Sequence, residues 1–257
     1  MAPVNPKIVI INLLRSKERR ERVIKHLETL GLMGEVFSAI DGRQLPEDEI
    51  AAVYNAERAK TTEWGELTRG EIGCALSHRA IWQKLIDSHD AGWLIIEDDA
   101  VLPTDLPIWL QRLSELARNG DVIPLVKTSP TPYFFRKVKL DSRWLVYPNQ
   151  SFIAATAYYI TPLAARRLLE ASTPIWFPID CWYSTPGFKG VTPVRAVWPE
   201  AVGVLDESVE ASTIGFREAH DLSRRKAPVQ RGYLRQQYGR FRRYIKNRFI
   251  VKPVRFD

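Results

Sequence analysis

A chain of 257 residues with 45% hydrophobic and 26% charged residues can bury a full core, as one large domain or one domain with an appendage. Its two distant cysteines, Cys74 and Cys181, supply neither a disulfide framework nor C-x-x-C metal spacing. No stretch reaches the ~20 apolar residues of a membrane-spanning helix, and the first residues lack the pattern of a signal peptide. We therefore expect a cytoplasmic location.

The net charge of +7 is unevenly distributed. Residues 221–257 contain 12 of the 37 Lys and Arg residues and 2 of the 30 acidic residues. The remaining chain then has 25 basic and 28 acidic residues, a net charge of −3. The basic character therefore belongs to the C-terminal tail.

The first 42 residues predict a β-α-β unit. An apolar run over residues 7–13, which contains Asn12, is typical of a buried strand, and residues 35–40 give a second strand before the turn pair Asp41-Gly42. Between them, Ser16 is expected to cap a helix that stops at Gly31. Neither G-x-G-x-x-G nor G-x-x-x-x-G-K-[ST] is present, so no dinucleotide fold or P-loop is indicated.

Residues 46–88 predict two helices separated by a polar loop. Pro46 opens a short helix, and the loop covers residues 61–65. Thr68 and Glu71 form a capping-box pattern, and the apolar residues behind them keep a helical period to about Ser88. From spacing alone, Glu71 can be a capping residue and His78 a partly buried helix histidine.

The run Trp93-Leu-Ile-Ile-Glu-Asp-Asp99 is an apolar strand that ends in three carboxylates. In an open α/β sheet, the loops at the carboxyl ends of the strands line the ligand crevice. Alternate side chains of an extended chain share a face, so Glu97 and Asp99 can converge while Asp98 turns away. Hard oxygen ligands suit Mg²⁺ or Mn²⁺, which would also offset the repulsion among the acids. The structural alternative is a solvated acidic turn.

Further along the chain, helices are expected from Asp105 and from Thr161, and strands over residues 122–127, 156–160 and 194–198. Residues 133–147 resemble a hairpin, interpreted as an inserted flap. Asp180 is a second acidic candidate, and four aromatic residues flank it. Such rings can stack on sugars or simply pack in the core. The aromatic residues are Trp176, Phe177, Trp182 and Tyr183.

Residues 232–250 predict a basic amphipathic helix, because apolar residues recur at helical spacing with Arg and Lys between them. Such a helix can lie on an anionic membrane surface. We therefore divide the chain into a main domain, residues 1–222, and a basic tail, residues 223–257.

These motifs, taken together, resemble glycosyltransferase family 25, the bacterial lipooligosaccharide galactosyltransferases with relatives in collagen glycosylation. The most specific combination is Glu71-Ile-Gly-Cys-Ala-Leu-Ser-His78 followed closely by Ile96-Glu-Asp-Asp99. The resemblance covers about residues 7–215 and leaves out the tail. The other matching stretches are 9–13 with Arg19-Arg20, 37–42, 156–169 and 178–180.

The resemblance implies a GT-A-like α/β fold with a mostly parallel sheet flanked by helices. It also implies a UDP-sugar donor, inversion at the anomeric carbon and, together with the acidic triplet, Mn²⁺ or Mg²⁺. Carried over, Asp99 is the metal ligand, and Glu97 or Asp98 completes the shell or holds the donor ribose. The expected nucleotide pocket consists of Asn12, Ala39, Asp41 and Gly42, with Glu71, Ser77 and His78 facing the donor.

An inverting displacement at a sugar hydroxyl needs a carboxylate base. We assign that role to Asp180, with Asp206 and Glu207 as alternatives. The expected acceptor is a lipooligosaccharide, a lipopolysaccharide or a related glycan, lipid-linked or free. The donor sugar is expected to be galactose, and the enzyme is expected at the inner face of the cytoplasmic membrane.

Two other classes compete with this hypothesis. A nucleic-acid-binding protein is suggested by a pI of 9.4 and the basic tail, but the net charge of the main domain argues against it, and no nucleic acid is expected. A glycoside hydrolase would also use paired carboxylates, but it has no need of a nucleotide pocket.

Overall fold

The computed structural model describes residues 5–62, 64–126, 137–148, 155–184 and 191–205. Its centre is a five-stranded sheet in the order β2-β1-β3-β8-β5. Strand bounds are β1 Lys7–Asn12, β2 Glu35–Ser38, β3 Trp93–Glu97, β5 Val122–Pro124 and β8 Ala157–Ile160. The expected strand over residues 122–127 is therefore shorter than predicted.

The sheet is mostly parallel, as the sequence predicts. Strand β1 pairs in parallel with both β2 and β3, whereas β8 runs antiparallel to β3 and β5. The carboxyl ends of β1, β2 and β3 consequently meet at one edge of the sheet. This edge carries Asn12, the segment after Ser38 and the acidic triplet after Ile96.

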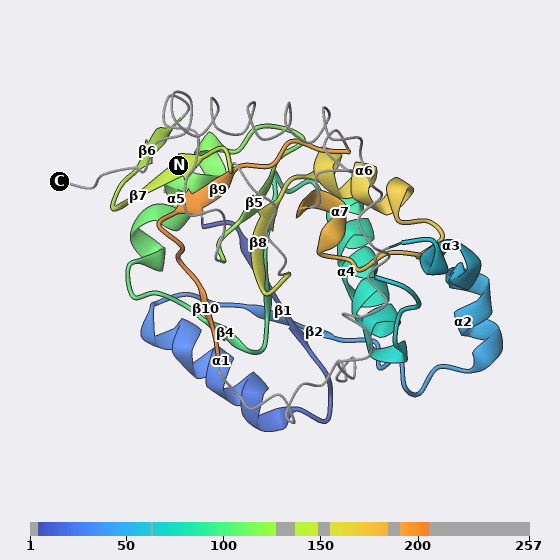
Figure 1. Cartoon of the computed structure of the whole chain (residues 1–257). Coiled ribbons are helices and arrows are strands. Elements are labelled where there is room, and N and C mark those ends of the chain that lie inside the picture. Colours follow the sequence, from blue (N-terminus) through green and yellow to red (C-terminus); the bar gives the residue numbers. More distant parts are fainter. Residues whose placement is uncertain (1–4, 63, 127–136, 149–154, 185–190, 206–257) are drawn as a thin grey trace, which may run out of the picture.

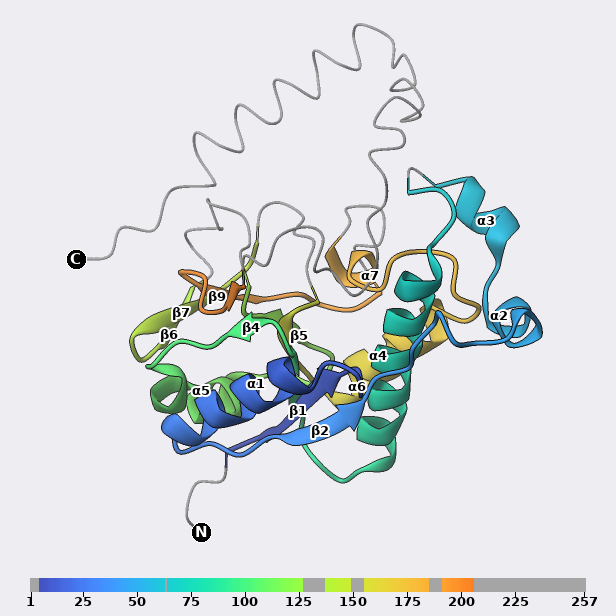
Figure 2. The same cartoon turned by 90° about the horizontal axis from the view of Figure 1, so that it is seen from below.

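Helices cover both faces of the sheet (Figures 1 and 2). Helices α1 (Lys17–Thr29) and α5 (Leu106–Leu116) pack on one face, and α4 (Arg69–Asp87) and α6 (Pro162–Ala171) pack on the other. Alternation along the strands divides the buried side chains between two clusters, so that Tyr158 faces α4 and Tyr159 faces α5.

The two long helices of the N-terminal half begin differently. Helix α4 begins with the predicted capping box, in which Thr68 and Glu71 bond to each other's backbone N–H. Ser16 is the N-cap residue of α1, as expected, but its side chain makes no capping hydrogen bond. The Ser16 carbonyl instead accepts a bond from Asn12. Gly31, just beyond α1, has φ +67, as a glycine stop signal predicts.

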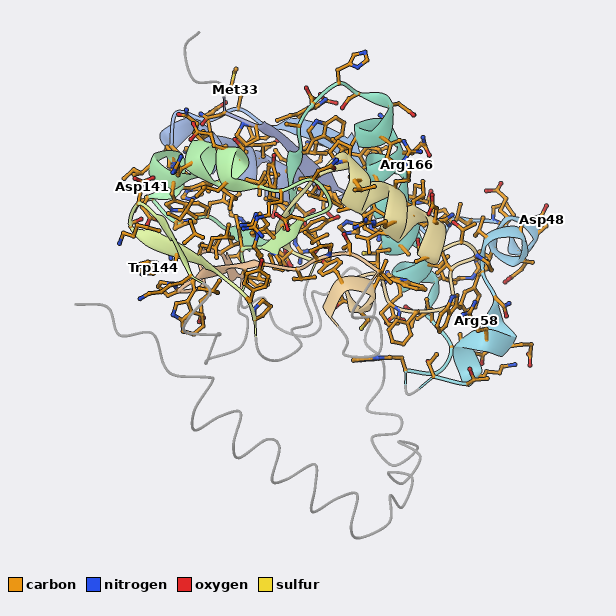
Figure 3. The ribbon with its side chains drawn as sticks, turned by 90° about the horizontal axis from the view of Figure 1, so that it is seen from above. Met33, Asp48, Arg58, Asp141, Trp144 and Arg166 are labelled. Carbon is orange, nitrogen blue, oxygen red and sulfur yellow. The ribbon has the colours of Figure 1, made fainter. Side chains whose placement is uncertain are left out.

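The remaining elements are short. Helix α2 (Glu47–Val53) is followed by α3 (Ala56–Lys60), which the sequence analysis missed. Figure 3 shows Asp48 and Arg58, from these two helices, to one side of the central layers. Helix α7 (Cys181–Ser184) follows Asp180, and β4 (Ala100–Val101) pairs with β10 (Gly203–Val204).

The predicted hairpin consists of β6 (Val138–Leu140) and β7 (Arg143–Val146). It is no free flap, because β7 also pairs with β9 (Ala196–Trp198). Arg143 donates to both carboxylate oxygens of Asp105 at the start of α5. The described part of this segment is therefore anchored to the domain.

The predicted base alternatives, Asp206 and Glu207, and the whole basic tail lie outside the described residues. Among the described helices, none is both long enough and apolar enough to span a membrane.

Candidate functional site at the carboxyl edge of the sheet

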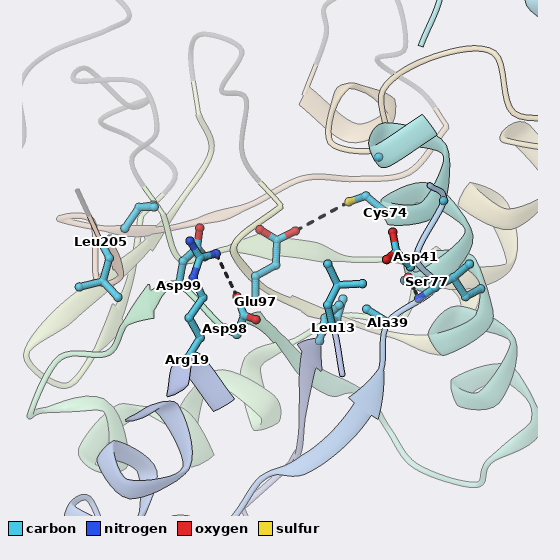
Figure 4. A pocket seen from close by; sticks show the side chains of 15 residues that line it. Leu13, Arg19, Ala39, Asp41, Cys74, Ser77, Glu97, Asp98, Asp99 and Leu205 are labelled. Atoms are coloured by element: carbon cyan, nitrogen blue, oxygen red, sulfur yellow. Dashed lines mark hydrogen bonds and ion pairs between the residues drawn. The ribbon is translucent and has the colours of Figure 1, made fainter. Parts of the chain in front are cut away.

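A cavity of about 250 Å³ lies where strands β1, β2 and β3 end (Figure 4). Its walls come from the strand ends, from the first turn of α1, from the N-terminal half of α4, and from the segment around β10. The lining residues are Ile11, Leu13, Arg19, Ala39, Ile40, Asp41, Gly42, Gly70, Cys74, Ser77, Glu97, Asp98, Asp99, Val204 and Leu205.

The three acids Glu97, Asp98 and Asp99, at the end of β3, all line this cavity, and Asp98 is the most firmly held. Asn12 Nδ2 donates to Asp98 Oδ2 over 2.6 Å, and Arg19 Nη1 lies 3.7 Å from Oδ1. Burial raises the pKa of Asp98, while Asn12 and Arg19 lower it. Asn12 itself is buried and is not among the lining residues. It acts on the site through Asp98.

Asp99 carries the largest electrostatic cost in the triplet. Burial, and then the charges of Glu97 and Asp98, raise its pKa from 3.8 to about 7. Among the described residues, its buried Oδ1 has no hydrogen-bond partner. Buried polar atoms are normally satisfied, so this oxygen has an unused bonding capacity that a ligand could meet. A cation here would meet the unpaired oxygen and relieve the repulsion. The residues present therefore fit a divalent metal.

The opposite wall is the segment after β2, held by close backbone packing. Ile40 N donates to Ser77 Oγ over 2.8 Å. A Cβ added to Gly73 would lie 2.6 Å from the Ile40 carbonyl oxygen, and one added to Gly42 would collide with the Arg69 carbonyl. Both positions therefore need glycine. This packing holds residues 39–42 against α4, where they line the cavity.

Of the three residues of α4 that were predicted to face the donor, one lines the cavity and two do not. Ser77 lines the cavity, but its hydroxyl is engaged with Ile40 N and Gly73 O. Glu71 and His78 are not among the lining residues. The Glu71 carboxylate closes the capping box, which is the structural alternative for that residue. His78 is fully buried behind Glu97, with Nε2 3.3 Å from Oε1.

Cys74, His78 and Glu97 form a second donor set, in which the ligand atoms lie within 4.8 Å of one another. Burial of the Cys74 sulfur, aided by Glu97, raises the pKa of the thiol well above its usual range. This mixed set suits a softer ion such as Zn²⁺, whereas the carboxylates of Glu97 and Asp99 suit Mg²⁺ or Mn²⁺. Both sets include Glu97.

Asp180 is not among the lining residues, but it lies close to them. Burial raises its pKa, and so does the charge of Glu97, while a hydrogen bond to Cys181 lowers it. The four aromatic residues around Asp180 are 2–8% exposed. They pack against one another, with Trp176 and Trp182 in an edge-on contact, so the core-packing alternative describes them.

Several lining residues were not predicted. Arg19 and Cys74 were noted only as parts of matching motifs, and Cys74 also as a cysteine without metal spacing. Val204 and Leu205 reach the cavity because the backbone N–H of Leu205 bonds to the Asp99 carbonyl oxygen over 3.0 Å. Pairing between β10 and the chain after β3 has no signal in the local sequence.

Comparison with known proteins places this site in a family. The family model described as glycosyltransferase family 25 (LPS biosynthesis protein) matches residues 5–183. The chain belongs to glycosyltransferase family 25. The match includes every predicted site residue from Asn12 to Asp180.

Among curated family 25 relatives, a glycosyltransferase 25 family member of Anopheles gambiae is 38% identical over 190 residues, 67% of this chain and 30% of that protein. Procollagen galactosyltransferase 2 of Mus musculus is 34% identical over 113 residues, 42% of this chain and 18% of that protein. A human relative, inactive glycosyltransferase 25 family member 3, is 30% identical over 188 residues, 68% of this chain and 30% of that protein. The chain spans less than a third of the length of the first such relatives it matches.

Proposed function

We propose that this chain is a metal-dependent, inverting glycosyltransferase that moves galactose from a UDP-sugar to a glycan acceptor. The observation that carries the proposal is the acidic triplet that lines the cavity at the carboxyl edge of the sheet, in which Asp99 Oδ1 is buried without a hydrogen-bond partner among the described residues. Family membership supports the reaction class. The name of the mouse relative, a galactosyltransferase, supports the choice of sugar.

The nucleotide half of the donor fits the wall formed by residues 39–42. Here the Asp41 carboxylate and nearby backbone groups can bond to a base and a ribose. Asp41 is held by an ion pair to Arg15 and by the backbone N–H of Arg43. The pocket is therefore shaped before the donor arrives, which lowers the ordering cost of binding.

The diphosphate half fits the opposite wall. Asp99 and Glu97 would hold the cation, which, when bound, offsets negative charge that develops on the UDP leaving group. Asp98, fixed by Asn12 and Arg19, keeps the turn in place. Without a cation, three carboxylates would repel a diphosphate, so the proposed metal dependence follows from charge.

In the chemical step, the acceptor hydroxyl oxygen bonds to the anomeric carbon as the bond from that carbon to the diphosphate oxygen breaks. The UDP leaves with the electron pair, and the hydroxyl proton passes to the Asp180 carboxylate. A raised pKa suits a group that must accept a proton near neutral pH. Asp206 and Glu207 remain alternatives for this role.

The proposed acceptor is a lipid-linked or free glycan of the lipooligosaccharide type. The family description, LPS biosynthesis protein, supports this choice. A basic tail attracted to anionic lipid would hold the enzyme at the cytoplasmic face, where such an acceptor is displayed.

A donor screen tests the proposal. UDP-galactose, UDP-glucose and UDP-N-acetylglucosamine are each incubated with Mn²⁺, and UDP release is measured with and without acceptors. We expect acceptor-stimulated release from UDP-galactose, lost in EDTA. Donor binding without release would contradict transferase activity and assign the chain a binding role; the human relative shows that the family contains a member named as inactive. Hydrolysis of a nucleotide-free glycoside would favour a glycosidase.

A further inference from the structure

A buried row of hydrogen bonds leads from the core to Glu97. Trp82 Nε1 lies 2.9 Å from Tyr158 Oη, Tyr158 Oη lies 2.7 Å from His78 Nδ1, and His78 Nε2 lies 3.3 Å from Glu97 Oε1. Trp82, Tyr158 and His78 are each 0% exposed. Protein groups must therefore satisfy their polar atoms, and the row joins helix α4, strand β8 and strand β3.

The indole of Trp82 fixes which group donates and which accepts in each hydrogen bond of the row. An indole N–H can only donate, so Tyr158 Oη accepts from Trp82. Burial raises the pKa of Tyr158 well above its usual range, so the phenol keeps its proton. Among the described residues, the acceptor in reach of that proton is His78 Nδ1. Nδ1 is therefore the unprotonated nitrogen of a neutral ring.

The proton of the neutral ring then sits on Nε2, which donates to the Glu97 carboxylate. The opposite tautomer would leave the Tyr158 proton without an acceptor, and it would set the Nε2 lone pair against a carboxylate. Each of these two mismatches would leave a buried polar group unpaired, which costs free energy. All three hydrogen bonds are satisfied together only in the Nε2–H tautomer.

We propose that Trp82 and Tyr158 are positioning residues, which lock His78 in the Nε2–H tautomer and thereby aim Glu97 into the cavity. With Oε1 bonded to His78, Oε2 is the oxygen that Glu97 could offer to a ligand in the cavity that it lines. A histidine that orients a carboxylate in this way acts as an outer-shell partner does in a metal site. What Glu97 then binds rests on the proposed function, but the tautomer does not.

The chain offers a matched control in the next residue. Tyr159 lies on the same strand and is also 0% exposed, but it faces the other core cluster. Its hydroxyl has no hydrogen-bond partner among the described residues. Tyr159→Phe and Tyr158→Phe therefore remove the same atom from neighbouring buried sites, and only the second interrupts the row.

Nitrogen NMR of ¹⁵N-histidine-labelled protein reads the tautomer directly, with the His78 signals assigned by their loss in His78→Gln. We expect a protonated Nε2 and an unprotonated Nδ1 in the native chain and in Tyr159→Phe. In Tyr158→Phe, we expect both shifts to move toward a tautomer average. An Nδ1–H native ring, or unchanged shifts in Tyr158→Phe, would overturn the proposal. The native spectrum alone tests it if that variant does not fold.

Mn²⁺ affinity, measured by electron paramagnetic resonance, tests the consequence for Glu97. We expect Tyr158→Phe to weaken Mn²⁺ binding by roughly 10-fold, the lower end for an outer-shell residue, and Tyr159→Phe to leave it unchanged. His78→Gln, whose amide can still donate to Glu97, should retain more affinity than His78→Leu. Equal losses in the two tyrosine variants would refute positioning. A native chain that binds no Mn²⁺ refutes the metal role of Glu97 and leaves the tautomer result standing.

Discussion

At the scale of single residues, Asp99 is the acid of the site whose negative charge destabilises the fold most. The pKa of this carboxyl group rises from 3.8 to about 7 on folding. Between these two pH values, the group is protonated in the folded state and ionised in the unfolded state. The folded chain therefore loses stability as the pH rises from about 4 to about 7, and the full cost is present above that. A bound cation would reverse this cost. Stability is thus given up at the position proposed to bind the ligand.

Asp99→Asn should stabilise the metal-free protein at pH 8, because the amide has no charge to bury. A gain on the order of 1 kcal/mol would raise the Tm by roughly 2–4 °C, and the gap should close toward pH 4. Thermal melts in EDTA across this pH range measure it. A gap that does not change with pH would contradict the electrostatic cost assigned to Asp99.

Asp180→Asn should keep donor affinity near native and lower turnover at least ~10²-fold, the usual contribution of a positioned base. Donor titration and steady-state kinetics separate the two effects. Lost donor affinity would instead place Asp180 in the donor site. Native-like turnover would transfer the role to Asp206 or Glu207.

At the scale of elements, the wall formed by residues 39–42, which is proposed to bind the nucleotide, depends on backbone contact between residues 40–42 and α4. Gly73→Ala would push its new methyl group into the Ile40 carbonyl, only 2.6 Å away. We expect at least 10-fold weaker donor binding. Gly203→Ala is the control, since its Cβ would meet Val101 at an ordinary 3.6 Å. Equal donor affinity in both variants would show that this wall is not part of the donor site.

The elements that could be predicted are those with a local signal. The apolar run before Glu97 predicts β3, and the Thr68–Glu71 pair predicts the start of α4. The antiparallel direction of β8 could not be predicted, because it depends on pairing with β3 and β5. Likewise, Arg19 reaches Asp98 only because α1 packs beside the turn after β3, which is a tertiary contact.

At the scale of the whole molecule, charge divides the chain into a slightly acidic main domain and a basic tail. The tail prediction rests on sequence alone, because residues 206–257 lie outside the described structure. Each basic residue near an anionic bilayer contributes on the order of 1 kcal/mol, so several suffice for reversible attachment.

Truncation after Arg224 should abolish sedimentation with phosphatidylglycerol vesicles, because it removes 11 of the 12 basic residues in residues 221–257. Turnover on a short soluble acceptor should be preserved. Phosphatidylcholine vesicles, which have no net charge, are the control. Vesicle binding that survives truncation in low salt, or a truncated chain that does not fold, would contradict a separable membrane anchor.

The proposed function depends above all on the acids at the end of β3, which are proposed to bind a divalent cation together with a UDP-sugar. Its most direct test is UDP release from UDP-galactose by the native chain and by Asp99→Ala, with Mn²⁺ or with EDTA. The account predicts release by the native chain with Mn²⁺, none in EDTA, recovery when Mn²⁺ is returned, and none from Asp99→Ala in either condition. Full native activity in EDTA, or native-like release by Asp99→Ala, would contradict it.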